Sequence, residues 1–131
     1  MIRVPPFVEQ MEVNHMKYVL LFCAEGADVE RFAAMTDDQK AAQLAQVGAW
    51  YQENRSSITG GNPLAPPEAA TTVRFDGSGQ PLITDGPFLE ANEVIGGYIE
   101  VDVPDLDEAL RLARTWPPRG TVEVRPVQEM G

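Results

Sequence analysis

Residue types that build reactive or cross-linked sites are scarce in this chain of 131 residues. It has one cysteine, Cys23, so no intrachain disulfide can form, and one histidine, His15. Because zinc sites draw on several cysteine or histidine ligands, we expect no metal and no other cofactor. Cys23 ends an apolar run at residues 18–22, where a small buried residue is expected; a reactive thiol is the alternative.

Positive charge is scarce as well, since 10 lysines and arginines face 20 acidic residues and the net charge is −10. The basic residues are scattered, and such an acidic surface repels phosphate backbones and anionic lipids. No apolar run reaches the length of about 18 residues that a membrane-spanning helix needs. Residues 1–16 lack the basic and apolar regions of a secretory signal. We therefore expect a cytoplasmic protein that binds neither nucleic acid nor a membrane.

The length fits one domain, which can bury about two thirds of its unfolded surface without disulfides or metals. The hydrophobic share of 44% and charged share of 23% are those of a globular protein. Residues 1–15 show no clean periodicity, whereas the apolar pattern begins directly after Met16. We expect a flexible N-terminal extension over residues 1–15 and one α+β domain over residues 16–131.

Apolar periodicity and turn residues predict the order strand, helix, strand, hairpin, strand, helix, strand. The first helix is predicted to begin at a capping box of Thr36 and Gln39 and to end near Asn54. The second is predicted to begin at Asp105, with Glu108 three residues later. The predicted strands cover residues 18–23, the segment beginning at residue 58, residues 71–75 and 82–84 of the hairpin, 94–103 and 121–127.

The same patterns predict which side chains are buried. Residues 24–35, with a glycine and several acids, are interpreted as a connection. In the first helix Leu44, Val47 and Tyr51 recur at helical spacing. The apolar face of the second helix is predicted to consist of Leu106, Ala109, Leu110 and Ala113.

Each helix can connect two strands of a ferredoxin-like βαββαβ unit with an inserted hairpin, both helices covering one face of an antiparallel sheet. The opposite sheet face then carries apolar side chains with nothing of the same chain over it. Such a face favours self-association. We therefore expect a homodimer that forms through the open face of the sheet.

The string Thr-Asp-Gly-Pro-Phe at residues 84–88 is the most distinctive motif, and Glu90 and Glu93 follow it. Together with other matches, it makes the chain resemble the DGPF-domain branch of the YCII-related proteins over residues 17–127. This resemblance implies a dimeric α+β barrel. The supporting matches lie at residues 17–21, 60–61, 64–67, 95–98, 103–109 and 122–127.

The resemblance also bears on activity. Some YCII-related proteins resemble enzymes that act on small ring compounds with a His-Asp pair, the histidine lying on the first helix. The corresponding stretch here, residues 45–50, reads Ala-Gln-Val-Gly-Ala-Trp, without a histidine. That departure argues against a His-Asp mechanism. Members of this branch are also associated with alternative sigma factors, which implies a regulatory role.

Asp85 is the candidate catalytic residue. Held rigidly beside Gly86 and an apolar neighbour, Phe88, its carboxylate could act as a base; alternatively, it forms an Asx-turn that fixes the loop. Glu90 and its neighbour Glu93 could act as an acid–base pair or bind a cation with Asp85, or form a solvated edge.

Other candidates would bind a ligand rather than react with it. Arg74 could anchor a carboxylate or pair with an acid across the hairpin. The aromatic residues Trp50, Tyr51 and Tyr98 could form the walls of an apolar pocket, or simply belong to the core or a dimer contact.

Two functions follow from these residues. The first is a non-catalytic module that binds an unknown small molecule or regulates, linked to an alternative sigma factor. The alternative is an isomerase or lyase acting on a small molecule, with Asp85 as base, Arg74 as anchor and Tyr98 as a pocket wall.

Overall fold

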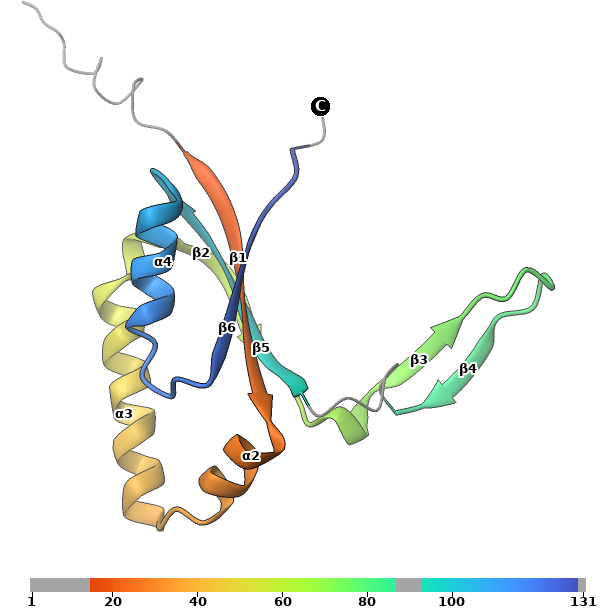
Figure 1. Ribbon diagram of the computed structural model, residues 1–131, viewed down its shortest axis with the longest axis horizontal. Helices are drawn as coiled ribbons and strands as arrows, with labels where there is room; N and C mark the ends of the chain where they lie inside the picture. Colours follow the sequence, from red (N-terminus) through yellow and green to blue (C-terminus); the bar gives the residue numbers. More distant parts are fainter. Residues whose placement is uncertain (1–14, 87–92, 130–131) are drawn as a thin grey trace, which may run out of the picture.

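The computed structural model of the protein describes residues 15–86 and 93–129 (Figure 1). Most of the predicted extension, residues 1–14, therefore lies outside the described residues. His15, at its end, places its ring Nδ1 3.1 Å from a carboxylate oxygen of Asp102.

A four-stranded antiparallel sheet has the strand order β2-β5-β1-β6. Strand β1 (Met16–Glu25) lies between β5 (Glu93–Val103) and β6 (Thr121–Pro126), and β2 (Ile58–Pro63) occupies the other edge. The apolar run at residues 18–22 was predicted to form a strand, and this prediction is confirmed. A mixed α+β fold is thus established.

Helix α3 (Asp37–Glu53) begins at the predicted capping box. The Thr36 Oγ accepts a hydrogen bond from the Gln39 amide at 3.1 Å, and the Gln39 side chain accepts one from the Thr36 amide at 2.8 Å. These bonds satisfy two donors that a helix N-terminus otherwise leaves without partners. A short 3₁₀ turn, η1 (Arg55–Ser57), connects α3 to β2.

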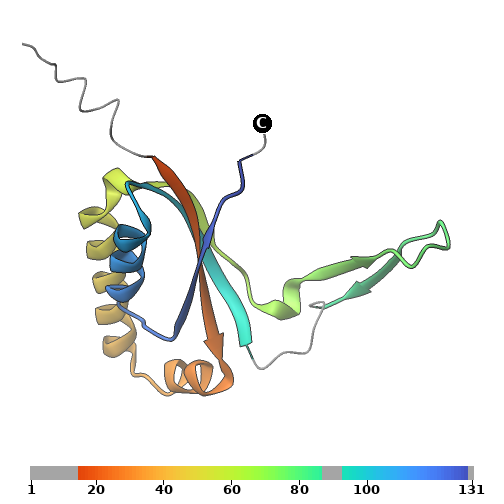
Figure 2. The same cartoon turned by 45° about the horizontal axis from the view of Figure 1, so that its top comes forward.

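Helix α4 (Leu106–Arg114) also begins where the sequence predicted. The Asp105 carboxylate accepts a hydrogen bond from the Glu108 amide at 2.9 Å, as an N-cap residue does. Helices α3 and α4 lie on the same side of the sheet, and the other face of the sheet is left open by the described chain (Figures 1 and 2).

The segment between β1 and α3 was interpreted from the sequence as a connection, and this interpretation was wrong. The segment holds a helix, α2 (Gly26–Ala33). Glu25 and Asp28 form a capping box at its N-terminus. The Asp28 carboxylate accepts a hydrogen bond from the Glu25 amide at 2.9 Å. Arg31, one turn later, pairs with Asp28. Because glutamate is an uncommon N-cap residue, the start of this helix has only a weak signal in the sequence.

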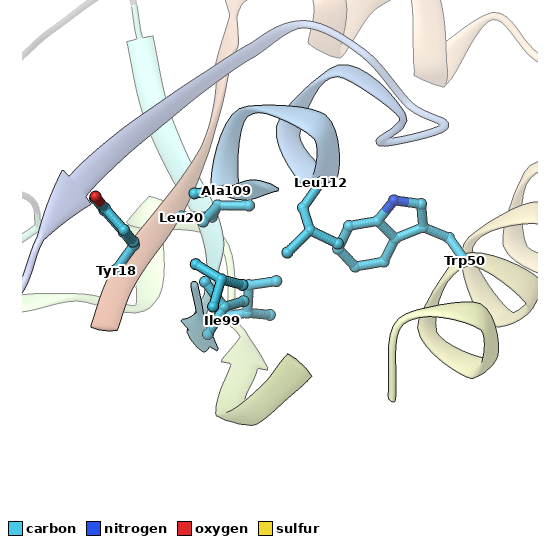
Figure 3. Close-up of a cluster of buried hydrophobic side chains, with 8 residues drawn as sticks. Tyr18, Leu20, Trp50, Ile99, Ala109 and Leu112 are labelled. Atoms are coloured by element: carbon cyan, nitrogen blue, oxygen red, sulfur yellow. The ribbon is translucent and has the colours of Figure 1, made fainter. Parts of the chain in front are cut away.

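The core lies between the sheet and the pair α3–α4 (Figure 3). Alternate side chains of β5, those of Ile99, Val101 and Val103, are buried in it. Each fully buried aliphatic side chain contributes about 1.5–3 kcal/mol relative to an exposed one. The side chains with less than 2% exposure and the largest volumes are Leu20, Ile99, Leu112, Val101 and Val103.

The two predicted helix faces are confirmed in part. On α4, Ala109 is fully buried and Ala113 packs against the core, but Leu106 is 47% exposed and Leu112 is buried instead. On α3, Tyr51 packs against the core, but Leu44 is 72% exposed and Trp50 is buried. The errors arise because several registers fit a short apolar pattern and only the packing partners select one.

A second sheet consists of the hairpin β3 (Thr71–Arg74) and β4 (Leu82–Asp85), which confirms the predicted hairpin. It follows the 3₁₀ turn η2 (Pro67–Ala69). The hairpin projects away from the rest of the molecule, on the side of the main sheet opposite α3 and α4 (Figures 1 and 2).

Candidate functional site

A cavity of about 1270 Å³ opens at the end of the sheet where β1 leads into α2. Its walls come from α2, α3, the segment after β2, the beginning of β5 and the turn before β6. Small-molecule sites usually measure roughly 300–1,000 Å³, so this cavity has room for a ligand of moderate size.

The floor of the cavity is a rigid aromatic cluster. The rings of Phe22 and Trp116 are stacked, with centroids 4.0 Å apart and an interplanar angle of 20°. Behind them Trp50 meets Trp116 edge-on at 5.0 Å, and its indole N–H donates a hydrogen bond to the Thr115 hydroxyl at 2.9 Å. Stacked and edge-on pairs hold aromatic rings in fixed orientations, so the floor is pre-organised.

The walls are apolar but incompletely covered. Val29 and Phe32 of α2 are 51% and 47% exposed, and Leu64 and Ile95, from the opposite wall, are 47% and 48% exposed. Scattered exposed apolar residues are common, whereas several that converge on one cavity indicate a binding surface.

A bulge shapes this end of the sheet. Phe22 pairs with Gly97 but the next residue, Cys23, pairs with Ile95, so Gly96 is an extra residue on β5. The Gly96 carbonyl accepts a hydrogen bond from the Leu64 amide at 2.9 Å, which draws the segment after β2 to the cavity wall. Bulges bend a strand and redirect its side chains, which is how the sheet ends beside an opening.

Two acidic residues line the cavity, Asp28 on α2 and the exposed Glu68 on η2. A hydrogen bond from the Glu25 amide and the pairing with Arg31 lower the pKa of the Asp28 carboxyl. A carboxylate with a lowered pKa is a weak proton acceptor. Asp28 therefore stays ionised and caps α2 rather than acting as a base.

Arginine and glutamine side chains supply hydrogen-bond donors for a ligand. Arg119 has a left-handed backbone, with φ of 64°, and among residues 15–86 and 93–129 its guanidinium makes no ion pair. Gln43 and Gln46 add side-chain amides from α3. Together these groups can donate hydrogen bonds to a carbonyl, hydroxyl or carboxylate at the edge of an apolar ligand.

The site residues predicted from the sequence do not gather around this cavity. Asp85 and Arg74 lie on the projecting hairpin and are exposed, and Tyr98 is 36% exposed on the open face of the sheet. Among the described residues that line the cavity, none of these three is present. The predicted residues Phe88 and Glu90 lie outside the described residues.

The two aromatic residues of α3 lie in and beside the core. Trp50 is 4% exposed and supports the cavity floor from behind. Tyr51 is half-buried, meets the Trp50 ring edge-on at 5.3 Å, and burial raises the pKa of its hydroxyl. Their arrangement is that of packing residues.

Sequence reasoning missed the residues that do line the cavity. The signal for Val29 and Phe32 was their spacing of three in an acidic segment, which is that of one helix face. Trp116 and Arg119 lie in a turn, where no periodicity reveals the direction of a side chain.

Within the described part of the chain, no three histidine, cysteine, aspartate or glutamate side chains gather in a way that could hold a metal ion. The helices of that part are also too short or too polar to cross a lipid bilayer.

Residues 16–131 match the family described as the YCII-related domain, and the chain therefore belongs to the YCII-related family. A relative is the uncharacterized protein R00369 of Rhizobium meliloti (strain 1021), which is 41% identical over 68 residues. That match covers 49% of this chain and 54% of the relative, so it spans about half the length of each.

Proposed function

We propose that this protein binds a small, mainly apolar molecule in the cavity beside α2. The observation that carries the proposal is the convergence of four half-exposed apolar side chains on a pre-organised aromatic floor. Burying such side chains against a ligand removes apolar surface from water at about 25 cal/mol per Å². Arg119 and the two glutamines of α3 would orient a polar group at the edge of the ligand.

Binding is favoured over catalysis by the chemistry of the described lining. It contains two carboxylates, Asp28 and the exposed Glu68. The pKa of Asp28 is lowered and this residue is engaged in capping, whereas a base needs a pKa near the working pH. The alternative of an isomerase or lyase that uses Asp85 stays a prediction; the exposed position of Asp85 on the hairpin gives it no support.

We also propose a ferredoxin-like arrangement and a homodimer, as the family resemblance implies. The strand order and the shared side of α3 and α4 support a ferredoxin-like arrangement. Half-buried Val19 and Leu21 on the open sheet face support a homodimer through that face. Membership of the DGPF branch, the link to an alternative sigma factor and the cytoplasmic location stay predictions.

The test uses the fluorescent probe 8-anilinonaphthalene-1-sulfonate, which combines apolar rings with one anionic group. We expect saturable binding to the native protein. Phe32→Ala should weaken binding about tenfold, because roughly 1.5 kcal/mol of aromatic contact is lost. Arg119→Ala should weaken it less, and more strongly at low salt than at high salt.

The matched control is Leu44→Ala, since Leu44 is 72% exposed on α3 and is not among the lining residues. It should bind the probe as the native protein does. Equal affinity in all three variants, with circular dichroism showing an intact fold, would contradict the proposed site.

A further inference from the structure

One face of the hairpin β3–β4 is apolar and is left uncovered by the described chain. Val73 and Ile83 pair directly across the two strands. Phe75 follows directly after the end of β3, and continuing the alternation of that strand by one residue would place it on the same side as Val73. These three side chains are 49%, 63% and 80% exposed, respectively.

Two further hydrogen bonds close the base of the hairpin. The Gly86 amide donates a hydrogen bond to the Ala70 carbonyl at 2.7 Å, and the Thr72 hydroxyl donates one to the Gly86 carbonyl at 2.7 Å. The outer part has a regular register but no third strand among the described residues. Since a two-stranded hairpin alone is marginally stable in water, its outer part needs a surface to pack on.

The direction of the hairpin indicates what this surface is. It projects on the side of the main sheet that α3 and α4 leave open (Figures 1 and 2). A molecule seated on the open face, over Val19 and Leu21, would therefore also lie alongside the hairpin. Two copies related by a two-fold axis would cover both surfaces in each, because every contact is then made twice.

The exposed apolar area of the open sheet face and the hairpin is consistent with a dimer interface. A stable interface buries about 800 Å² on each partner. The central part of a four-stranded sheet face supplies part of this area, and Phe75 alone can bury on the order of 150 Å². Val73 and Ile83 add to it, being 49% and 63% exposed. A neutral apolar arm also suits the association of two chains that each carry a net charge of −10.

We propose that the hairpin β3–β4 is an arm whose face of Val73, Phe75 and Ile83 packs against a second copy of this chain. The inference rests on the homodimer through the open sheet face that is proposed above. It adds that the arm supplies much of the binding free energy of the dimer, and it assigns the exposed aromatic ring of Phe75 as its anchor.

Sedimentation equilibrium of the full chain over a range of concentrations tests the arm. We expect the native protein to dimerise and Phe75→Asp to weaken dimerisation by at least about 30-fold, as loss of an interface anchor does. A second variant replaces residues 73–83 with Asn-Gly, which closes a two-residue turn between the paired Thr72 and Thr84. It should weaken dimerisation by a similar factor.

The control is Leu44→Asp, which places the same charge at an exposed leucine of α3, on the covered side of the sheet. It should dimerise as the native protein does. A native protein that stays monomeric at every concentration would overturn both the dimer and the arm. A native dimer whose affinity is unchanged in Phe75→Asp and in the shortened variant would overturn the arm alone. The probe assay is independent of both outcomes and reports on the cavity.

Discussion

The two ends of the main sheet differ in how completely their apolar side chains are covered. Under α4, Val101, Val103 and Leu112 are at most 1% exposed; we call this the filled end. Beside α2, Val29 and Phe32 are about half exposed and line a cavity; we call this the open end. The difference teaches that the packed interior and the cavity of the proposed ligand lie in separate parts of one domain.

The largest expected effect comes from the filled end. Leu112→Ala should lower the free energy of unfolding by about 2–5 kcal/mol, because it removes a fully buried side chain and leaves a cavity. The matched change at the open end, Phe32→Ala, should cost less than about 1 kcal/mol despite the larger side chain. Urea unfolding measures both. Similar losses for the two would break the comparison.

The next largest loss of stability is expected where the backbones of β2 and β5 approach each other closely. Gly61 has φ of 139°, and a Cβ there would lie 2.3 Å from the Tyr98 carbonyl oxygen. Gly61→Ala should therefore cost about 2–4 kcal/mol through strain and overlap. Its neighbour Gly60 has no atom within 4 Å of such a Cβ, so Gly60→Ala is the control and should cost far less. Equal denaturation midpoints would contradict the close approach.

A smaller loss of stability is expected when the hydrogen bonds that join the end of α3 to α4 are removed. Asn54 is 6% exposed; its amide donates a hydrogen bond to the Trp50 carbonyl at 2.8 Å and accepts one from Arg111 at 3.0 Å. Asn54→Ala should cost about 1–3 kcal/mol, since it leaves a buried polar contact unmade. Gln46→Ala, at an exposed site of α3, serves as the control in thermal unfolding.

The smallest effect is a pH dependence that both ends share. The hydrogen bonds from Arg111 lower the pKa of Glu108 from 4.5, and those from the Glu25 amide and Arg31 lower the pKa of Asp28 from 3.8. A lowered pKa in the folded state gives stability that is present above the unfolded-state pKa and is lost as pH falls through the folded-state pKa.

This pH dependence is measured as the difference in urea midpoint between native protein and variant along a descending pH series. Against Glu108→Gln, the advantage of the native protein should shrink as pH falls below 4.5; against Asp28→Asn, it should shrink below 3.8. Both advantages are small because the pairs are near the surface. An advantage that grows on acidification would contradict the pairing.

Much of the fold could be predicted from the sequence, because capping residues and apolar patterns mark where its helices and strands lie. The capping residues Thr36 and Asp105 marked the two longer helices, and the alternation around Val101 marked a strand with one buried face. Helix α2 was missed because Glu25 is an uncommon cap. Leu112 was missed because only the packing of α4 on the sheet selects which of several registers faces inward.

The residues of the candidate site were much harder to predict from the sequence. A cavity is defined by space between elements, and its lining combines residues as distant as Val29, Leu64 and Trp116. Motif reasoning instead favoured Asp85, since the string around it is distinctive. Distinctive strings mark turns as readily as they mark chemistry. The structure places that residue on the hairpin, where its role as a site residue stays a prediction.

The extra residue at Gly96 has a consequence for how such a protein diverges during evolution. It divides β5 into a part that packs under the helices and a part that frames an opening, with the change of register between them. Val29 and Ile95 at the opening are about half exposed, so substitutions there disturb the packed interior little. Over many generations such substitutions can accumulate more readily than changes at the filled end.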